Sequence, residues 1–478
     1  MPEKFNYRQS LQMRRNYIGK PCKLHFEAAP LKIVCASKQY VYDDNGEEYL
    51  DCVNNISHVG HCHPQVVSAG QEQMAKLTTG SGFLNDVVAE YAKRLIETFP
   101  ESLSVVYFLN SGSEANDLAL CLARSYTKNE DVVVIDNAFH GNLSNMVSIS
   151  PLRFKRQQLK QEDWVHVVPC PDTYRGMVRD PLHPDAGIIY ANEVKRLMDQ
   201  ATARGRKIAA FFSECLLSQC GMILPPQSYF ENVYRYIRDA GGLCVVDEIA
   251  NGMGRIGEHM WSFQHWNVVP DIVTIGKPVG NGYPMSAVIT RREIADSLKE
   301  FSSGFGGNPV SCSMGLAVLD VIKNEKLMSS AKSVGKCLLD GFRAIMPCHP
   351  MMGDVRGLGL SVGIEIVTDT DSRKPATEAA DMLTYRLKQE KIIISNEGPD
   401  KNVMAITPPM CFTADNAQRL IQAFDHALAD IEKGTLGRPI RPATEGKYTA
   451  AQMSIIVGDE EDVEQEPDSK RTKYFDLD

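Results

Sequence analysis

The chain has 478 residues, of which 43% are hydrophobic and 23% charged, and this composition is typical of a globular protein with one large and one smaller domain. No apolar run approaches the roughly 18 residues that a membrane span needs, and the formal net charge of -9 argues against a nucleic-acid-binding protein. Thirteen cysteines without a CxxC pair indicate free thiols in a reducing compartment rather than a disulfide framework.

The first 60 residues are predicted to begin the smaller domain. Short β-branched and aromatic runs at 33–34, 40–42 and 49–51 flank an Asn-Gly turn, which predicts a small antiparallel sheet. No apolar core of the signal-peptide kind precedes them, so we expect an intracellular protein of the cytosol or mitochondrial matrix that is not secreted. Four basic residues near the N-terminus are compatible with a mitochondrial targeting sequence: Lys4, Arg8, Arg14 and Arg15.

The run His61-Cys62-His63-Pro64 contains residue types that bind metals. A structural zinc site needs four ligands, and only His58 lies close by as a further candidate. A proline also ends the run, so we expect a structural turn and no metal.

A strand at 105–109 is predicted to lead into a helix that begins at Ser113, because apolar residues from Ala115 to Leu122 recur at helical spacing. Serine hydroxyls and free amides at a helix N-terminus form an anion site. The loop 110–113 is therefore a candidate for binding a phosphate, and a simple N-cap is the alternative.

The next strand, 131–135, ends close to Phe139 and His140. An aromatic ring at a strand end can stack on a flat ligand, although a core phenylalanine would give the same pattern. We expect His140 to form a neighbouring wall, because the lysine described below already provides a base.

Residues 151–190 are rich in charge and proline, which predicts an excursion over the surface of the sheet. A helix at 191–204 and a buried strand at 208–212 follow. The strand leads to Glu214. A charged residue that simply faces solvent at the end of a strand would give the same sequence pattern.

Two further strands lead to residues whose side chains are suited to catalysis. The strand 243–247 ends on Asp247, and the strand 272–275 runs into Lys277 and a turn of Gly, Pro and Asn. Open α/β sheets bind ligands in the crevice at the carboxyl ends of their strands. A lysine there is placed for Schiff-base chemistry, and an acid there can keep a pyridine nitrogen protonated. On the local pattern alone, a solvated lysine is the alternative.

The run Gly252–Gly257 has the GxGxxG spacing of dinucleotide folds. However, its glycines begin five residues after Asp247, no clean helical period follows, and no acid ends the next strand, so we disfavour a dinucleotide site. A P-loop is excluded, because Lys277 precedes a proline and lacks the required upstream glycine.

The C-terminal part is predicted to be α+β. A helix at 312–325 leads to a glycine-containing run and a strand at 360–367, and two helices flank a strand at 392–394. We expect four parts: 1–59 and 326–436 forming the small domain, 60–325 forming the large cofactor-binding domain, and a disordered acidic tail at 437–478.

Four runs, in this order along the chain, resemble the class III (ω-type) aminotransferases that use pyridoxal phosphate: Asn110–Asp117, Phe139–Gly141, Val246–Ile249 and Ile275–Pro278. The likeness is greatest to the alanine-glyoxylate aminotransferase 2-like branch, which includes ethanolamine-phosphate phospho-lyase and 5-phosphohydroxy-lysine phospho-lyase. It extends from about residue 8 to residue 433. It implies an α/β fold of type I, with a mostly parallel sheet in the large domain and a smaller α+β domain built from both chain ends.

The resemblance also implies roles for single residues. Lys277 would form the Schiff base with pyridoxal phosphate and move a proton, while Asp247 would hold the ring nitrogen. The remaining cofactor-binding positions would be Gly112, Ser113, Phe139, His140 and Gly304. Glu214 and Arg356 would lie near the substrate. The resemblance further implies a homodimer or homotetramer, and we expect no nucleic acid, membrane or metal as a partner.

Four positions depart from the family's pattern. Ala250 replaces a glutamine that contacts the cofactor ring, and Gly304 replaces a threonine that reaches the neighbouring subunit's phosphate. Ala405 and Gly82 replace basic residues. An anionic substrate loses charge-assisted partners where basic residues are missing.

We therefore expect a pyridoxal-phosphate enzyme that acts on a primary amine and resembles the phospho-lyases, which release aldehyde, ammonia and phosphate. Transamination of the alanine-glyoxylate type is the alternative reaction. The rival from another class is a non-catalytic homologue that keeps the fold, which the departures favour and the retained Lys277 and Asp247 oppose.

Overall fold

The computed structural model describes residues 4–80 and 82–434, and the chain divides into two compact units. Among the described residues, one unit comprises residues 4–32 and the other comprises residues 33–80 and 82–434. In the first unit, helix α1 (Tyr7–Tyr17) begins with a capping box between Asn6 and Gln9. The acidic tail predicted at 437–478 lies outside the described residues.

The larger unit is built around a seven-stranded sheet in the order β4-β10-β9-β8-β7-β5-β6. In that order the strands are Val105–Leu109, Ser286–Thr290, Ile272–Ile275, Leu243–Asp247, Ile208–Ser213, Asp131–Ile135 and Val165–Val168. Strand β10 runs antiparallel to both of its neighbours, β4 and β9, and every other neighbouring pair in this sheet is parallel. The predicted mostly parallel sheet is therefore confirmed.

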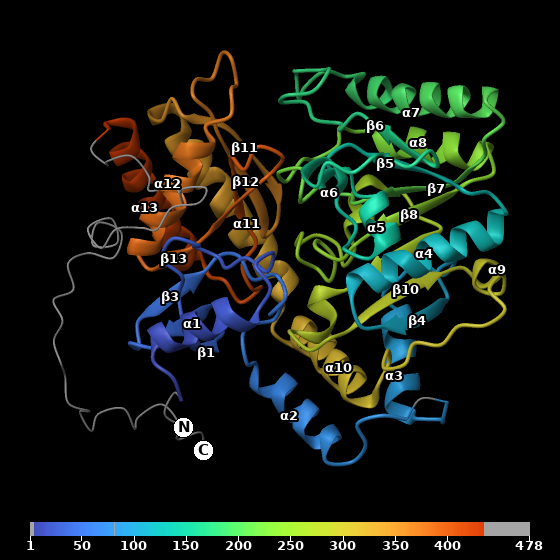
Figure 1. Ribbon diagram of the computed structural model, residues 1–478, viewed down its shortest axis with the longest axis horizontal. Helices are drawn as coiled ribbons and strands as arrows, with labels where there is room; N and C mark the ends of the chain where they lie inside the picture. Colours follow the sequence, from blue (N-terminus) through green and yellow to red (C-terminus); the bar gives the residue numbers. More distant parts are fainter. Residues whose placement is uncertain (1–3, 81, 435–478) are drawn as a thin grey trace. The chain divides into compact units, whose positions relative to one another are not determined.

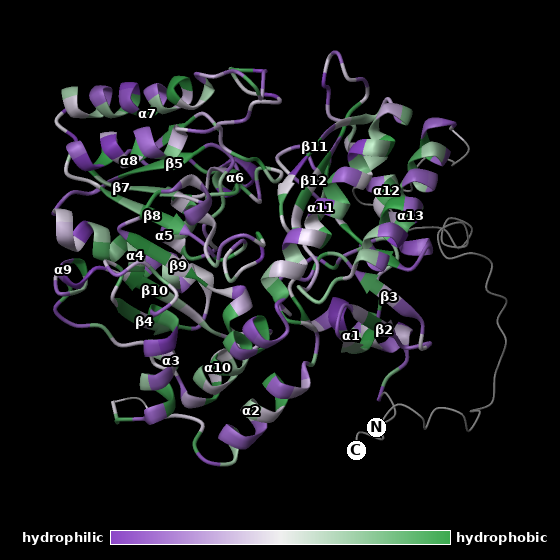
Figure 2. Ribbon diagram, turned by 180° about the vertical axis from the view of Figure 1, so that it is seen from behind, coloured by the Kyte–Doolittle hydropathy of each residue, from purple (hydrophilic) through white to green (hydrophobic). Residues whose placement is uncertain are grey.

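Helices cover both faces of this sheet, with α4 (Gly112–Thr127) on one side and α7 (Ala186–Ala203) and α8 (Tyr229–Asp239) on the other (Figure 1). Successive side chains of a strand point to opposite faces. Accordingly, Val134 and Phe212 pack in one core with α4, whereas Phe211 packs in the other core with α8. Figure 2 shows how strongly hydrophobic these strands are. Burial on both faces explains why they read as continuous apolar runs.

The prediction that 151–190 only crosses the surface is wrong. This region contains helix α6 (Pro151–Arg156) and the edge strand β6, and α7 begins at Ala186 rather than at residue 191. His166 interrupts the apolar pattern of β6, yet its buried Nε2 lies 2.6 Å from Asp131 Oδ2 on the neighbouring strand. A histidine satisfied by a carboxylate across the ladder cannot be recognised from a local apolar pattern.

Two four-stranded sheets complete the larger unit, with orders β1-β2-β3-β13 and β11-β12-β15-β14. The first joins strands from the two ends of the unit, because β13 pairs parallel with β3. The strands are Ile33–Ser37, Tyr40–Asp43, Glu48–Asp51 and Ile392–Ile393 in the first sheet, and Met352–Leu358, Ser361–Ile366, Val403–Ile406 and Ser395–Glu397 in the second. The predicted N-terminal antiparallel strands and the strands near 360 and 392 are confirmed.

The remaining helices pack around these sheets: α2 (Pro64–Met74), α3 (Asp86–Ile96), α5 (Ser144–Ser148), α9 (Arg292–Ala295), α10 (Pro309–Asn324), α11 (Leu327–Ile345), α12 (Thr377–Gln389) and α13 (Ala414–Glu432). Short 3-10 helices occupy Ser262–Trp266, Lys277–Gly280 and Met346–Cys348. In the part of the chain that the structure describes, no helix combines the length and apolar character that crossing a bilayer requires.

Candidate active site

The two predicted chemical residues follow neighbouring strands. Asp247 is the last residue of β8 and pairs with Thr274 of β9, and Lys277 comes two residues after the end of β9. Lys277 has a φ of 34°, a left-handed conformation that is uncommon outside glycine. Such strained backbone often occurs at functional sites.

The charge of Lys277 is disfavoured by its surroundings. Burial lowers the pKa of its amine, although Glu214 and Asp247 partly offset that effect. A lowered pKa increases the fraction of neutral amine, which is the nucleophilic form in Schiff-base chemistry.

Asp247 is fixed by three hydrogen bonds. Its Oδ2 accepts from Asn116 Nδ2 at 2.8 Å and from His140 Nδ1 at 2.9 Å, while its Oδ1 accepts from the amide of Ile249 at 3.1 Å. Asn116 is itself oriented by Thr274 Oγ1, which donates to Asn116 Oδ1 at 2.7 Å. These bonds hold the Asp247 carboxyl group in a single orientation.

Sequence reasoning gave no role to Asn116 or Thr274. Asn116 lies on α4 and Thr274 on β9, and only the packing of helix on sheet brings them to Asp247. His140, predicted as a neighbouring wall, instead contacts the Asp247 carboxylate. Its second nitrogen, Nε2, is buried and has no hydrogen-bond partner among the described residues.

The start of α4 lies beside the lysine turn. A side chain built on Gly112 would come within 2.7 Å of Ile249, and one built on Gly276 would lie 3.6 Å from the Cα of Gly112. A side chain at position 112 would require Ile249 to move, and the first amides of a helix have no acceptor within it. The N-cap is Ser111, whose side chain accepts from the amide of Glu114. Ser113 Oγ accepts from the amide of Asn142 at 3.1 Å.

Glu214 is buried and accepts hydrogen bonds from the amide and the hydroxyl of Ser218. Burial raises the pKa of Glu214 to about 8, Asp247 adds to this rise, and Ser218 and Lys277 oppose it. Glu214 is thus electrostatically coupled to both strand-end residues. Phe139 is half-buried, with the guanidinium of Arg153 5.3 Å from its ring centroid.

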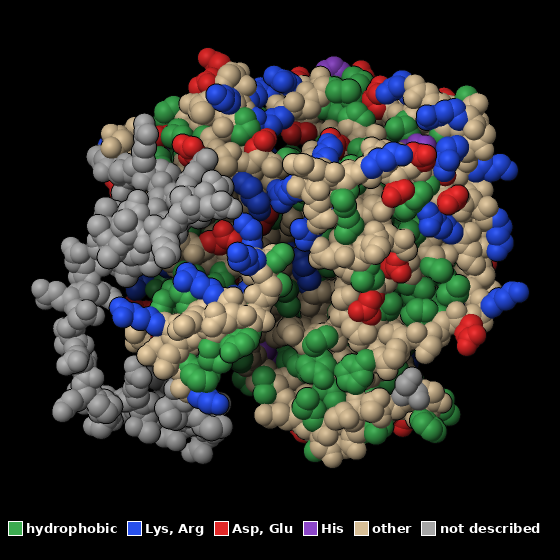
Figure 3. Space-filling model, in the orientation of Figure 1, with side chains coloured by type: hydrophobic (Ala, Val, Ile, Leu, Met, Phe, Trp, Pro, Cys, Tyr) green, Lys and Arg blue, Asp and Glu red, His purple; other side chains and the backbone are tan. Residues whose placement is uncertain are grey.

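Arg356 is engaged by internal partners. Its guanidinium donates to Glu365 at 2.6 Å, to Asp354 at 2.8 Å and to the carbonyl of Gly221 at 2.7 and 2.9 Å. Burial opposes its charge, but Glu365 and Asp354 hold its pKa above the ordinary value. Arg356 lines a cavity of about 300 Å³ that Asp136, Cys170 and Asn402 also line. Figure 3 shows a hollow near the middle of one face, with Lys and Arg side chains gathered around it.

The four departing positions have different surroundings. Ala250 and Ala405 are buried, whereas Gly304 and Gly82 are exposed, and a side chain built at either glycine would meet no atom within 4 Å. Gly82 has a φ of 81°, so a basic side chain there would require a strained backbone. At Gly304 the described chain leaves room for a threonine.

The His61-Cys62-His63 turn is held by contacts between its two histidines and carboxylates. His61 Nε2 lies 2.8 Å from Asp51, and His63 Nε2 lies 2.9 Å from Glu325. Across residues 4–80 and 82–434, no group of three or more His, Cys, Asp or Glu side chains is arranged to hold a metal ion.

We expect stability to fall with rising pH. Burial raises the pKa of Glu248 to about 7 and that of Glu214 to about 8. In the unfolded chain, the pKa of a glutamate is about 4.3. Between these pKa values, the folded protein keeps protons that the unfolded chain has released. The contribution of the two glutamates to the free energy of unfolding therefore falls as pH rises from about 4.3 to about 8, by up to about 1.4 kcal/mol per pH unit for each group.

Thermal unfolding between pH 5 and pH 9 measures this effect. Glu248→Gln is the matched variant, because its amide oxygen can still accept from Ser262 Oγ and the Phe263 amide, as Glu248 Oε1 does. The variant should show a flatter dependence than wild type. A melting temperature that rises across this range in wild type would refute the expectation.

Comparison with known proteins gives the same family as the sequence motifs. A family model described as Aminotransferase class-III matches residues 25–428. The chain is 44% identical to the alanine-glyoxylate aminotransferase 2-like protein of Drosophila melanogaster, over 90% of this chain and 88% of that protein. It is 40% identical to ethanolamine-phosphate phospho-lyase homolog 1 of Caenorhabditis elegans, over 87% and 92% of the two chains.

A solved structure extends the likeness to the fold. A phospholyase from Arthrobacter in complex with phosphoethanolamine superposes with a TM-score of 0.84 at 35% identity, covering 88% of this chain and 99% of that chain. The type I fold that the resemblance implied is confirmed, and so is the resemblance itself.

Proposed function

Because the chain belongs to the class III aminotransferase family, we propose that it binds pyridoxal phosphate and acts on a primary amine. Pyridoxal phosphate supplies an aldehyde that condenses with amines and a ring that accepts electrons from the amine-bearing carbon. The observation that carries the proposal is the pair of strand-end residues, the strained Lys277 and the fixed Asp247.

The residues present fit this cofactor. Among the described residues, Asp247 Oδ1 accepts a hydrogen bond only from the Ile249 amide, so it can also accept one from a ring nitrogen. The amides that begin α4 at Gly112 and Ser113 suit a phosphate. Phe139 follows β5 on the same edge of the sheet and offers an aromatic face.

Each side chain then has a defined task. Lys277 holds the cofactor and afterwards moves the proton at the amine-bearing carbon of the substrate. Asp247, oriented by Asn116 and His140, keeps the ring nitrogen protonated. Glu214 is a second titratable group beside them, so its protonation state alters the charge that Lys277 experiences.

We expect phosphate release from phosphoethanolamine or phosphohydroxylysine to exceed transamination of alanine with glyoxylate. Two proteins similar to this chain are named phospho-lyases, and one was solved with phosphoethanolamine. Arg175 and Arg356 line the cavity of about 300 Å³, and although both pair with Glu365, basic side chains suit a phosphorylated amine. Inorganic phosphate and pyruvate measured side by side decide between the reactions, and pyruvate without phosphate would refute the phospho-lyase assignment.

The rival function is a homologue that keeps the fold without catalysis, and Ala250 and Gly304 favour it because neither residue can offer a side-chain hydrogen bond to a cofactor. A hydrogen bond to a charged group contributes about 1.5 to 3 kcal/mol, so a hydroxyl restored at position 304 should tighten cofactor binding roughly ten- to a hundredfold. The open space around Gly304 can accept that side chain. Titrating pyridoxal phosphate into wild type, Gly304→Thr and the double variant with Ala250→Gln measures the gain. If no variant binds more tightly, the site uses other groups.

We further propose a homodimer or homotetramer. Large apolar side chains are exposed at Phe83, Leu84 and Phe305, with exposures of 83%, 106% and 47%. Phe83 and Leu84 are adjacent in the chain, and contiguous exposed apolar surface often marks protein contacts. Phe305 follows Gly304 directly, which supports a position for this loop against a second subunit.

A further inference from the structure

The turn that carries Lys277 has an unusual backbone. It joins β9 to β10, and both Lys277 and Asn281 adopt the left-handed conformation, with φ angles of 34° and 46°. Asparagine is among the few residues other than glycine that adopt this conformation readily. Strained backbone persists where the surrounding contacts determine it. The contacts of Asn281 therefore bear on the position of Lys277.

The side-chain amide of Asn281 joins this turn to a distant segment of the chain. Its Oδ1 accepts a hydrogen bond from the amide of Val59 at 2.9 Å, and its Nδ2 donates to the carbonyl of Gly60 at 2.9 Å. The two bonds span 222 and 221 positions of the sequence. A planar amide that uses its acceptor and its donor on successive residues restrains both the position and the orientation of the turn.

The partner segment is itself anchored from several sides. His58 is fully buried, its Nε2 lies 2.8 Å from the carbonyl oxygen of Met253, and its own carbonyl accepts from the Met410 amide at 2.7 Å. His61 and Lys38 exchange two backbone hydrogen bonds, of 2.7 and 3.1 Å. The Asn281 amide therefore binds backbone that other contacts already hold in place.

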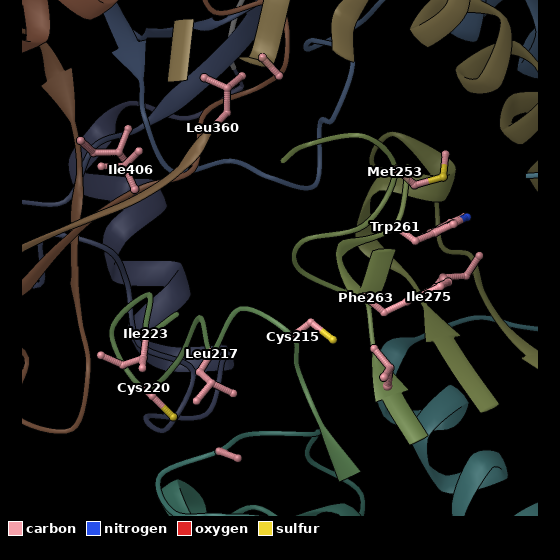
Figure 4. Close-up of a cluster of buried hydrophobic side chains, with 14 of the residues drawn as sticks. Cys215, Leu217, Cys220, Ile223, Met253, Trp261, Phe263, Ile275, Leu360 and Ile406 are labelled. Atoms are coloured by element: carbon pink, nitrogen blue, oxygen red, sulfur yellow. The ribbon is translucent and has the colours of Figure 1, made fainter. Parts of the chain in front are cut away.

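Apolar packing accompanies these hydrogen bonds. Ile275, the last residue of β9, and Met253, in the loop after β8, belong to one cluster of buried side chains (Figure 4). Val59 and Val279 of the lysine turn lie in the same cluster, and each is 1% exposed. Hydrophobic packing is not directional, whereas hydrogen bonds depend on angle. The orientation of the turn is thus determined more by the bonds of its asparagine than by its apolar contacts.

We propose that Asn281 is a positioning residue, whose hydrogen bonds to Val59 and Gly60 hold the Lys277 turn in the conformation that the proposed reaction requires. The proposal rests on Lys277 being the reactive lysine of the proposed function. Aspartate at this position would keep the acceptor for the Val59 amide but would place a second oxygen against the Gly60 carbonyl. Asparagine supplies both partners and tolerates the left-handed backbone.

Asn281→Gly removes both hydrogen bonds without adding strain, because glycine adopts positive φ freely. In the full-length protein without cofactor, Lys277 is methylated with formaldehyde and cyanoborohydride from pH 6 to pH 11, and peptide mapping gives its extent relative to its own plateau. Burial is the largest cause that lowers the pKa of the Lys277 amine. An amine that turns toward water loses part of this effect, so we expect the midpoint of methylation to rise by about one pH unit in the variant.

Turnover of a phosphorylated amine gives a second readout. Asn281→Gly should lower kcat by up to roughly 10²-fold, because a displaced catalytic group can cost this much, and should leave KM nearly unchanged. Asn267→Gly is the matched control. Asn267 has a φ of 52°, caps another 3-10 helix and is exposed, so its replacement should leave both readouts as in wild type.

Thermal unfolding shows whether each variant is folded. If Asn281→Gly does not fold, Asn281→Asp takes its place and should raise the Lys277 midpoint in the same direction. A folded variant whose Lys277 midpoint equals that of wild type would overturn the proposal. A wild-type protein that does not bind the cofactor would refute the proposed function instead, and methylation without cofactor would still decide whether Asn281 positions Lys277.

Discussion

Replacing Lys277 with alanine is expected to lower turnover of a phosphorylated amine roughly 10²- to 10⁴-fold, because the variant lacks the lysine that we propose moves the proton at the amine-bearing carbon. The half-buried position and lowered pKa of the amine favour that role over a solvated one. Phosphate release under saturating substrate and added cofactor is the measurement.

A matched control separates chemistry from folding. Lys299→Ala removes an exposed lysine and should keep wild-type turnover. Thermal unfolding of both variants verifies that each is folded. A folded Lys277→Ala enzyme with wild-type turnover would contradict the assigned role.

Asp247→Asn is expected to have the next largest effect. The substitution keeps the size of the side chain but removes the negative charge and offers an amide group where Asn116 Nδ2 and His140 Nδ1 now donate. Loss of a preorganised electrostatic partner costs roughly 10²- to 10³-fold in turnover. Steady-state rates of phosphate release measure the loss.

Asn116→Ala is the informative companion, because it leaves the Asp247 charge in place and removes one orienting hydrogen bond. Its loss of turnover should be smaller than that of Asp247→Asn. Equal losses in the two variants would indicate that orientation rather than charge determines the contribution of Asp247, and unchanged turnover in both would contradict any role for it.

The strand-end residues were predictable because their signals are local. An apolar β-branched run that leads into Lys277, or ends on Asp247, identifies both the strand and its carboxyl end. The start of α4 was displaced by one residue, because Ser111 rather than a later serine caps it. Helix boundaries commonly differ by one or two residues at each end.

The contacts of those residues were not predictable, because they join segments far apart in the chain. Asn116 and His140 reach Asp247 across 131 and 107 positions. The pairing of Arg356 with Glu365 depends on the antiparallel turn between β11 and β12. Strand β6 was missed because His166 is buried there by a partner on another strand. Hydrogen bonds between polar groups that lie far apart in the chain produce no periodic pattern in the sequence.

A spectroscopic titration tests the central claim most directly. Pyridoxal phosphate is added to the purified protein, the visible absorbance is followed, and borohydride is used to fix the bound cofactor before peptide mapping. The account predicts a saturable visible band and a reduced cofactor adduct on Lys277, both absent in Lys277→Ala. A protein that shows no such band, and whose Lys277→Ala variant binds the cofactor as tightly as wild type, would contradict it.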